Sequence, residues 1–264
     1  MTKLIVCDLD GTLIGRDEIL SESALKVATV ARDKGVAFTI ATGRTNELAS
    51  TFAEHLDISV PYIVSNGAKV IENGRVLWQR MIPLRGLREL LGVADHMGLS
   101  IIYTIDSTEY VHRETTWILR QREQFDRYHK VRPIDGSDWH ILYVEKVTVM
   151  DDIRDGRIDR IEDWCSQLGD GYGYTKYTDK AVELVHEEAT KANALQWILR
   201  YLNISTAEVV AFGDHQNDID MLTLAGTGVA VSNAIDDAKL AADVVTEAPE
   251  AEGVLAFVRE ILKD

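Results

Sequence analysis

The chain has 264 residues, of which 46% are hydrophobic and 27% charged, a composition typical of globular proteins and a length sufficient for two domains. Its formal net charge of −15 argues against non-specific binding to nucleic acid or to an anionic membrane, because both need basic patches. The two cysteines, Cys7 and Cys165, form no CxxC or zinc-type pattern, so we expect neither a disulfide framework nor a cysteine metal cluster.

The N-terminal segment does not resemble a signal peptide, because the apolar run after Lys3 is short and is soon interrupted by acidic residues. No apolar run in the sequence approaches the length needed to cross a membrane. The sequence therefore predicts a cytoplasmic protein that does not act at a membrane.

The first part of the chain alternates predicted strands and helices. Short apolar runs indicate the strands, and apolar residues at helical spacing indicate the helices between them. Gly35 ends the first predicted helix. In chain order we expect a strand at 4–7, a helix at 21–34, a strand at 36–41, a helix at 45–56, a strand at 62–64, and a hairpin pairing 69–71 with 75–78.

The pattern changes after Pro83. Strands and helices no longer alternate simply, which is typical of an α+β module. We expect helices at 84–97, 115–128 and 155–168, and strands around 100–104, 109–112, 141–150, 173–178 and 181–186.

The simple alternation returns after residue 188. We expect helices at 191–202, 217–224, 234–242 and 252–262, and strands at 209–212, 229–231 and 244–245. The predicted fold class is therefore α/β, with a Rossmann-like parallel-sheet core formed by residues 1–82 and 188–264. Residues 83–187 form an inserted α+β domain, since insertions are tolerated at exposed loops.

Two carboxylates follow the first predicted strand. Asp8 and Asp10 come directly after the apolar run 4–6, and Gly11 and Thr12 follow them. The carboxyl ends of strands in parallel α/β sheets are where ligands bind. Two crowded carboxylates repel each other and are costly to desolvate, and a divalent metal would relieve that cost. This stretch therefore predicts metal-assisted chemistry.

Further polar residues stand at the ends of other predicted strands and at one helix start. Together with the first pair they resemble the four motifs of the haloacid dehalogenase-like hydrolase superfamily. Their order and the large insertion between the second and third motifs resemble the Cof-type subfamily, which carries a type IIB cap domain. The motifs are Asp8-x-Asp10-Gly11-Thr12, Thr42-Gly43-Arg44, Lys191, and Gly213-Asp214-His215-Gln216-Asn217-Asp218.

The resemblance implies a division of work between the two acids. Asp8 is the expected nucleophile, because a carboxylate that attacks phosphorus gives an aspartyl-phosphate and divides one hard displacement into two. Asp10 is the expected general acid and base. The resemblance also implies a Mg²⁺ site made by the Asp8 side chain, the Asp10 main-chain carbonyl and Asp214, and Mg²⁺ prefers such oxygen ligands.

The same resemblance assigns groups that would hold the phosphate. Thr42 offers a hydroxyl, Gly43 a backbone N–H, and Lys191 a positive charge at a helix start. Arg44 is expected to contact the substrate or brace the loop. The resemblance also implies that Asn217 reaches the phosphate or a metal-bound water, and that Asp218 supports the metal site or Lys191.

Some of these assignments have alternatives. Thr190 is expected to cap the helix that begins at Lys191, and Lys180 is the alternative lysine. His215 is more simply a rim residue than a ligand, because Mg²⁺ disfavours imidazole. The acid pair could also be helix-capping residues, whereas a calcium-binding loop fits poorly, because Gly11 comes too early and a strand precedes it.

The sequence thus predicts a Mg²⁺-dependent phosphatase that acts on small phosphorylated metabolites, with sugar phosphates favoured by the resemblance. A phosphotransferase or phosphomutase would use the same four motifs. A non-catalytic binder of phosphorylated ligands is a further alternative, although such a protein has no need of Asp10.

Overall fold

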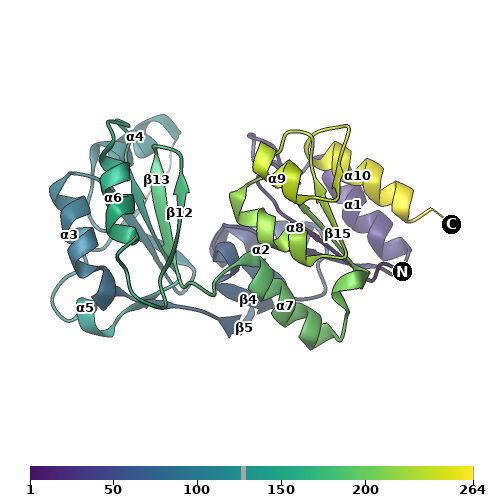
Figure 1. Cartoon of the computed structure of the whole chain (residues 1–264), viewed down its shortest axis with the longest axis horizontal. Coiled ribbons are helices and arrows are strands. Elements are labelled where there is room, and N and C mark those ends of the chain that lie inside the picture. The colour runs from purple at the N-terminus through teal and green to yellow at the C-terminus, as the bar shows by residue number, and fades with distance from the viewer. Residues whose placement is uncertain (126–128, 264) are drawn as a thin grey trace. The chain divides into compact units, whose positions relative to one another are not determined.

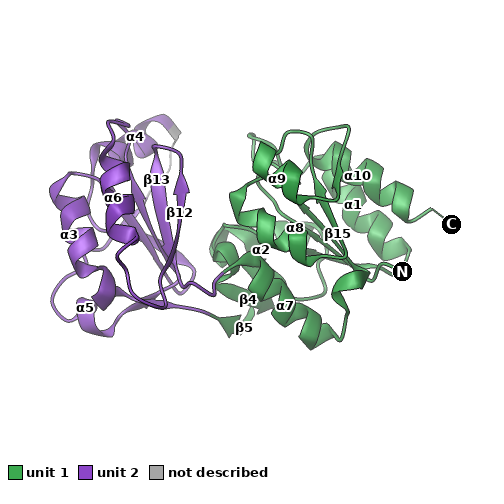
Figure 2. Ribbon diagram, in the orientation of Figure 1, with its two compact units in different colours: residues 1–79, 190–264 green, residues 80–189 purple. Residues whose placement is uncertain are grey.

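The computed structural model describes residues 1–125 and 129–263. The chain divides into two compact units, coloured separately in Figure 2: unit 1 is Met1–Gln79 with Thr190–Asp264, and unit 2 is Arg80–Ala189. The sequence predicts domain boundaries at residues 83 and 187, and the structure divides after Gln79 and after Ala189.

Unit 1 is built on a five-stranded sheet in which every neighbouring pair is parallel. The strands are almost entirely apolar, as expected for a parallel sheet covered on both faces. The predicted α/β class with a parallel core is therefore confirmed. In spatial order the strands are β16 (Val244–Val245), β15 (Thr227–Ala230), β14 (Val209–Gly213), β1 (Leu4–Cys7) and β2 (Ala37–Ile40).

The helices of unit 1 bury their apolar stripes in one core with the sheet. Helices α1 and α10, which come from opposite ends of the sequence, pack side by side, and α7 packs against α8 (Figure 1). The α-helices are α1 (Glu22–Asp33), α2 (Asn46–His55), α7 (Lys191–Leu202), α8 (Ile219–Leu224), α9 (Asp236–Ala241) and α10 (Glu250–Ile261), with 3-10 turns η1 (Ser65–Gly67), η3 (Thr206–Glu208) and η4 (Gln216–Asp218).

Strand β3 (Tyr62–Val64) belongs to a separate antiparallel sheet with β4 (Lys69–Glu72) and β5 (Arg75–Gln79). One parallel bridge, between Ala41 and Ile63, ties β3 to the end of β2. The turn η1 sends the chain directly back along β3, and so short a connection allows only antiparallel pairing, because a parallel neighbour needs a longer crossover.

Unit 2 contains a six-stranded sheet, antiparallel except for the pair β8–β9, with α3 packed on β7 and α6 on β13. It has its own hydrophobic core. In spatial order the strands are β12 (Gly173–Tyr177), β13 (Ala181–Val185), β11 (Lys146–Met150), β7 (Ser100–Ile105), β8 (Thr108–Val111) and β9 (Lys130–Val131); the other elements are β6 (Ile82–Pro83), η2 (Leu84–Leu87), α3 (Arg88–His96), α4 (Thr116–Phe125), α5 (Asp138–Ile141), β10 (Tyr143–Val144) and α6 (Arg157–Cys165).

One predicted element of unit 2 differs from the structure, and another extends beyond the described residues. The predicted helix 115–128 corresponds to α4, and its residues 126–128 lie outside the described part of the chain. The strand expected from Ile141 begins later, because Ile141 ends the short helix α5. Ile141 is followed by the apolar residues Leu142 and Tyr143, and a short apolar run of this kind fits a strand as well as the end of a helix.

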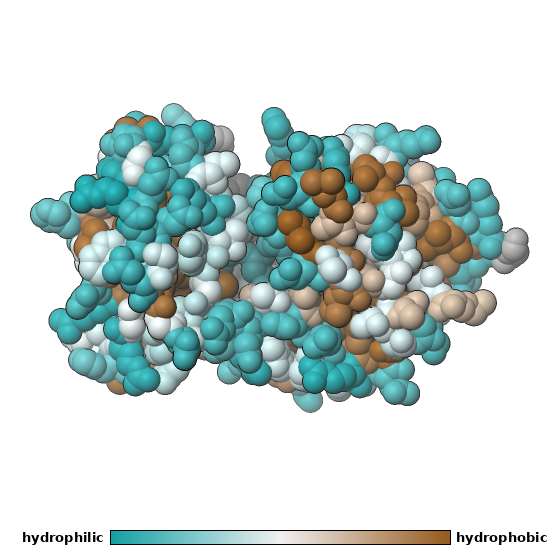
Figure 3. Space-filling view, viewed as in Figure 1, coloured by the Kyte–Doolittle hydropathy of each residue, from teal (hydrophilic) through white to brown (hydrophobic). Residues whose placement is uncertain are grey.

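No helix within the described residues is long and apolar enough to span a membrane. On the face drawn in Figure 3, apolar residues gather on unit 1 over α8 and α9, where Leu240 is largely exposed. Exposed leucines are ordinary in globular proteins.

Candidate active site

The parallel sheet of unit 1 brings three predicted site residues to one edge. Strands β1, β2 and β14 are neighbours in register, with Cys7 opposite both Ile40 and Phe212. Their carboxyl ends therefore coincide, so that Asp8, Thr42 and Asp214 follow them at the same edge of the sheet, the usual ligand-binding position in open α/β folds.

Lys191 links two of the acids. Its ammonium group donates to Asp8 Oδ1 at 2.5 Å and to Asp218 Oδ1 at 2.6 Å. All three residues are buried, with Lys191 only 1% exposed. Burial alone would lower the pKa of Lys191, but the two carboxylates outweigh it and raise the pKa, so the lysine stays charged. The site therefore holds one fixed positive charge between two acids.

Lys191 is held in place by the helix it begins. Thr190 is the N-cap of α7, and its hydroxyl accepts a hydrogen bond from the Asn193 N–H at 3.1 Å. This is the capping that the sequence predicts for Thr190. The alternative lysine, Lys180, belongs to unit 2, whereas Asp8, Lys191 and Asp218 belong to unit 1.

Asp218 organises the loop that follows β14. Its Oδ2 accepts from the backbone N–H groups of Asp214 and His215, both at 3.0 Å. A Cβ on Gly213 would lie 2.4 Å from the Asp218 Cβ, so a larger residue there would displace this carboxylate. With Oδ1 on Lys191, both oxygens of Asp218 accept hydrogen bonds from neighbouring groups of the site. His215 lies beside this loop and contributes its backbone N–H.

Asp214 faces the loop after β1. The Thr12 hydroxyl donates to Asp214 Oδ1 at 2.8 Å. Gly11 has φ +89, and a Cβ there would lie 2.4 Å from Asp214 Oδ2, so only glycine allows the two loops to approach this closely. The Asn233 side chain donates to the Gly11 carbonyl at 2.7 Å and holds the same loop from its other side.

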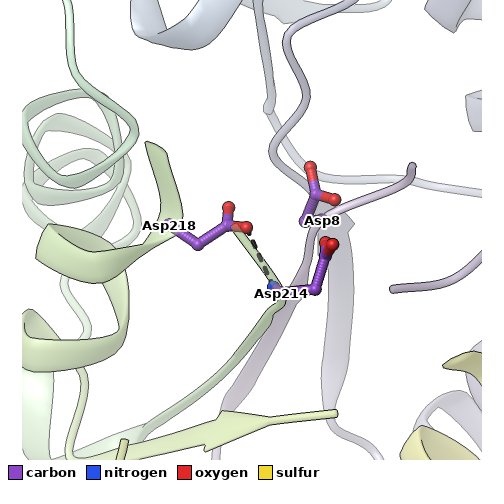
Figure 4. A group of neighbouring side chains, drawn as sticks. All are labelled: Asp8, Asp214 and Asp218. Atoms are coloured by element: carbon purple, nitrogen blue, oxygen red, sulfur yellow. Dashed lines mark hydrogen bonds between the residues drawn. The ribbon is translucent and has the colours of Figure 1, made fainter. Parts of the chain in front are cut away.

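Asp8, Asp214 and Asp218 form one acidic group. An oxygen from each lies within 4.8 Å of the others, and Figure 4 shows Asp8 and Asp214 reaching toward the same space while Asp218 bonds to the Asp214 backbone. Burial raises the pKa of Asp8, and the charges of Asp218 and Asp214 raise it further, although Lys191 opposes them. Burial and the Asp218 charge also raise the pKa of Asp214.

Three carboxylates lie around the single ammonium group of Lys191, so negative charge exceeds positive charge within this group. An all-oxygen donor set in such surroundings fits a hard divalent cation, which favours ionised carboxylates. Each of the three acids offers a carboxylate oxygen to such an ion. Asp218 accepts hydrogen bonds through both oxygens, whereas Lys191 binds Oδ1 of Asp8 and Thr12 binds Oδ1 of Asp214, so Asp8 and Asp214 are the better suited of the three.

Asp10 lies apart from the acidic group, with its side chain 49% exposed. Arg44 binds it in a bidentate pair, through Nε at 2.9 Å and a terminal nitrogen at 2.5 Å. The guanidinium also stacks over Phe52, 4.9 Å from the ring centroid, and lies 3.6 Å from Glu18. Hydrogen bonding to Asp10 raises the pKa of Arg44 despite partial burial. Arg44 thus holds the residue expected to transfer protons.

The loop after β2 is built around Thr42. The Arg44 N–H donates to the Thr42 hydroxyl at 3.1 Å, and the Thr42 N–H donates to the Ile63 carbonyl at 3.0 Å. Thr42 is fully buried, and Gly43 lies beside Asn66. These contacts fix the loop that is expected to hold the phosphate.

Three residues near the site were not predicted from the sequence. Thr12 stands inside the first motif, so its position next to Asp8 and Asp10 in the sequence could have indicated a place in the site. Asn66 accepts a hydrogen bond from Asn217 at 2.8 Å, and it stands in the polar stretch that follows β3. Asn233 approaches Gly11 only through the fold and gives no local signal.

An acid and a lysine buried together at the carboxyl edge of a parallel sheet, beside a second acid, place the chain among α/β proteins with a built site at the end of the sheet where ligands bind. The model of the haloacid dehalogenase-like hydrolase family matches residues 5–258. The chain belongs to this family.

Curated relatives share the whole length of the chain. It is 26% identical to the 5-amino-6-(5-phospho-D-ribitylamino)uracil phosphatase YitU of Bacillus subtilis, covering 97% of this chain and 96% of the relative. It is 28% identical to a phosphoglycolate phosphatase of Methanopyrus kandleri, covering 100% and 99%.

Solved structures share the fold. A haloacid dehalogenase-like hydrolase from Bacteroides thetaiotaomicron superimposes with a TM-score of 0.83 at 25% identity, covering 99% of this chain and 100% of that one. A subclass IIB sugar phosphatase gives a TM-score of 0.83 at 24% identity, covering 98% and 99%. The family model and the curated relatives confirm the Cof-type resemblance, and the protein is an enzyme of the phosphoric monoester hydrolase class.

Proposed function

We propose that this phosphatase hydrolyses small phosphorylated metabolites of the cytoplasm, sugar phosphates among them, through a phosphorylated Asp8. The observation that carries the proposal is the buried contact of Lys191 with Asp8 and Asp218, next to Asp214. The nucleophile is held in a site that already contains the positive charge needed by an anionic substrate, although the whole chain carries −15.

The first half-reaction is assigned to Asp8 and Asp10. Lys191 occupies Asp8 Oδ1, so we assign attack on phosphorus to Oδ2. The new bond joins Oδ2 to phosphorus while the bond from phosphorus to the leaving oxygen breaks. Protonated Asp10 gives its proton to that oxygen, and the alcohol departs.

The second half-reaction returns the enzyme to its starting state. Asp10, now a carboxylate, takes a proton from water as the water oxygen attacks phosphorus. The bond between phosphorus and Asp8 breaks, and inorganic phosphate leaves. Thr42 and the Gly43 N–H hold the phosphoryl oxygens during both steps, and Asn217 approaches them from the loop after β14.

We propose that Asp8 and Asp214, with the Asp10 main-chain carbonyl, hold Mg²⁺ next to the phosphate. A bound Mg²⁺ would supply positive charge to the phosphoryl oxygens. The raised pKa values of Asp8 and Asp214 support this assignment, because a cation favours the ionised form of both. Asp218 keeps its supporting role, through Lys191 and the backbone of the loop.

The substrate class rests on the kind of molecule on which the relatives act. YitU is named for a phosphorylated ribitylamino-uracil, the Methanopyrus kandleri relative for phosphoglycolate, and the subclass IIB structure for sugar phosphates. All are small phosphomonoesters. We therefore expect the same reaction here, with sugar phosphates as the first compounds to test.

A substrate panel tests the proposal. Phosphate release is measured from sugar phosphates, phosphoglycolate, nucleotides and phosphorylated cofactors, with Mg²⁺ and with EDTA. The wild type should release phosphate only with Mg²⁺. Acid-quenched protein, incubated with a labelled substrate, should carry phosphate that hydroxylamine removes, as an acyl-phosphate does.

Two variants serve as a matched pair in this experiment. Asp8→Asn should form no labelled protein, whereas Asp33→Asn, an exposed acid at the end of α1, should behave as the wild type. A labelled Asp8→Asn protein would disprove the nucleophile. Phosphate that passes to an added sugar in preference to water would favour the phosphotransferase, and no turnover of any phosphoester would favour the binder.

A further inference from the structure

The turn η1, which follows β3, has an unusual backbone. Ser65, Asn66 and Gly67 have φ values of 51°, 54° and 94°, so three consecutive residues lie in the left-handed region. Non-glycine residues rarely adopt this conformation, and runs of it are rarer still. Such strain persists only where surrounding contacts impose it, and it is concentrated at functional sites.

The backbone of this turn is joined to the loop that carries Thr42. The Ser65 N–H donates to the Arg44 carbonyl at 2.8 Å, and the Asn66 N–H donates to the Thr42 carbonyl at 3.0 Å. A Cβ built on Gly43 would lie 3.0 Å from Asn66 Oδ1, so the Asn66 side chain rests directly on the glycine of that loop.

The same turn also touches the start of α7. A Cβ on Gly67 would lie 2.2 Å from the Thr190 carbonyl oxygen and 2.9 Å from the Lys191 nitrogen. Only glycine allows the turn to pass so close to the N-terminus of the helix that holds Lys191.

The Asn66 side chain completes the connections of the turn. Its Oδ1 accepts a hydrogen bond from Asn217 Nδ2 at 2.8 Å, across 151 positions of sequence. An amide that donates through its nitrogen presents its oxygen in another direction, so this bond fixes the orientation of Asn217. The turn therefore contacts three segments that carry site residues: the loop after β2, the N-terminus of α7 and the loop after β14.

We propose that Asn66 is a positioning residue for phosphoryl transfer, which holds Asn217 and the Thr42–Arg44 loop at the separation that the transferring phosphoryl group requires. The inference rests on the proposed function, because it concerns the same phosphate site. Asn66 acts through Asn217 and Gly43 and is assigned no contact with the substrate. Groups that support a reacting site in this way typically contribute about 10–100-fold to its performance.

The turn between β4 and β5 offers a matched control. Asn73 is also an asparagine with positive φ, at 50°, but it is exposed at the tip of a hairpin. Glycine tolerates the left-handed region at either position. Asn66→Gly and Asn73→Gly therefore remove the same side chain from positions with similar positive φ, one beside the site and one exposed in a hairpin turn.

The experiment measures turnover and binding separately. Kinetics with Mg²⁺ and a sugar phosphate give kcat and KM, and calorimetry with Mg²⁺ gives the affinity for orthovanadate, which mimics the five-coordinate phosphorus, and for inorganic phosphate. Asn66→Gly should lose about 10–100-fold in kcat and in vanadate affinity with a smaller change in phosphate affinity, because the lost alignment matters most in the transition state. Asn73→Gly should match the wild type.

Two further variants separate positioning from general structural damage. Asn66→Asp keeps an acceptor for Asn217 and tolerates left-handed φ, so it should bind vanadate better than Asn66→Gly. The double variant Asn66→Gly with Asn217→Ala should lose less than the product of the two single losses, because both single variants break the same hydrogen bond between Asn66 and Asn217. Multiplied losses in the double variant would overturn the proposal.

Failure of this inference can be told from failure of the proposed function. If neither the wild type nor Asn73→Gly turns over any phosphoester, the proposed function is contradicted. The vanadate affinity of Asn66→Gly then still tests the positioning role of Asn66. If the wild type is active and Asn66→Gly equals Asn73→Gly in kcat and in vanadate affinity, the positioning role of Asn66 is contradicted and the proposed function is not.

Discussion

At the scale of single residues, Asp8 is placed where its charge is useful for chemistry and unfavourable for stability. Its pKa is raised by burial and by the charges of Asp218 and Asp214. A raised folded pKa means that the native state binds this proton more tightly than the unfolded chain. The contribution of Asp8 is therefore most favourable below the ordinary pKa of about 3.9 and is lost as pH rises toward the folded value.

We expect Asp8→Asn to abolish turnover and yet to stabilise the protein in EDTA at pH 7. The neutral amide removes the cost of a buried charge, and a gain of about 1 kcal/mol corresponds to roughly 2–4 °C in a protein of this size. Thermal unfolding at pH 7 and pH 4 measures the effect, which should be smaller at pH 4. A variant that melts below the wild type at pH 7 would contradict the assigned direction.

Arg44 gives a second prediction at this scale, because it holds Asp10 through two parallel hydrogen bonds. Arg44→Ala should lower kcat by roughly 10–100-fold with a smaller change in KM, since Asp10 loses its orientation. Arg44→Lys should not restore kcat, because an ammonium group cannot form the same fork. Steady-state kinetics test this against Arg75→Ala, an exposed arginine of β5. Full activity in Arg44→Lys would show that charge alone suffices.

At the scale of elements, the N-terminus of α7 connects stability with the site. Thr190→Ala removes the N-cap hydroxyl and should cost about 1 kcal/mol of folding free energy. Since Lys191 is the first residue of the helix, fraying should also lower kcat/KM. Thr190→Ser keeps the hydroxyl and should retain both properties. Urea unfolding and steady-state kinetics on the same preparations test the two effects. A Thr190→Ala variant with wild-type folding free energy but a lowered kcat/KM would show that the loss of activity does not follow from the loss of stability.

Most elements could be predicted where hydrophobic periodicity is long and clear. The strands β1 and β14 are uninterrupted apolar runs, and β2 is interrupted only by Thr39. Polar residues follow each strand, so both the sheet and its ligand-binding edge could be predicted from the sequence. The antiparallel pairing of β3 was harder to predict, because the apolar run Tyr62–Val64 fits a buried strand whether its partner is parallel or antiparallel.

The parts of the site that could not be predicted depend on contacts distant in sequence. Asn66 meets Asn217 across 151 positions, and Asn233 meets Gly11 across 222. Nothing in the local pattern of either asparagine indicates its partner. The pairing of Arg44 with Asp10 was also hidden, because an arginine in a phosphate-binding loop suggests a substrate contact equally well.

At the scale of the whole molecule, each unit has its own hydrophobic core, so each is expected to have its own unfolding transition. Asp151 gives a specific probe of unit 2. Burial would raise the pKa of its carboxyl, but hydrogen bonds from the Ile153 N–H and from Arg157 lower it below the usual value. The stability that Asp151 contributes is thus present above the unfolded pKa and is lost as pH falls through the lower folded value.

We expect Asp151→Asn to destabilise unit 2 by about 1.5–3 kcal/mol at pH 7, the range for hydrogen bonds to a charged group. The difference from the wild type should shrink as pH falls below about 4. Hydrogen exchange of the β7 and β11 amides reports on unit 2, and amides of β1 and β14 should be unaffected. Asp179→Asn, whose side chain is 53% exposed, is the control. A pH-independent difference would contradict the ionic origin.

The division of unit 1 into two segments has a consequence for how the protein is synthesised. Unit 2 is one continuous stretch and can fold once Ala189 has left the ribosome, whereas β1 must wait for β14, its other neighbour in the sheet. Asp8 emerges before unit 2, yet Lys191 and Asp214 come only after unit 2 is complete. A nascent chain therefore completes this site only after β14 has emerged, and a chain truncated before β14 contains Asp8 and Lys191 without the Asp214 and Asp218 that lie beside them.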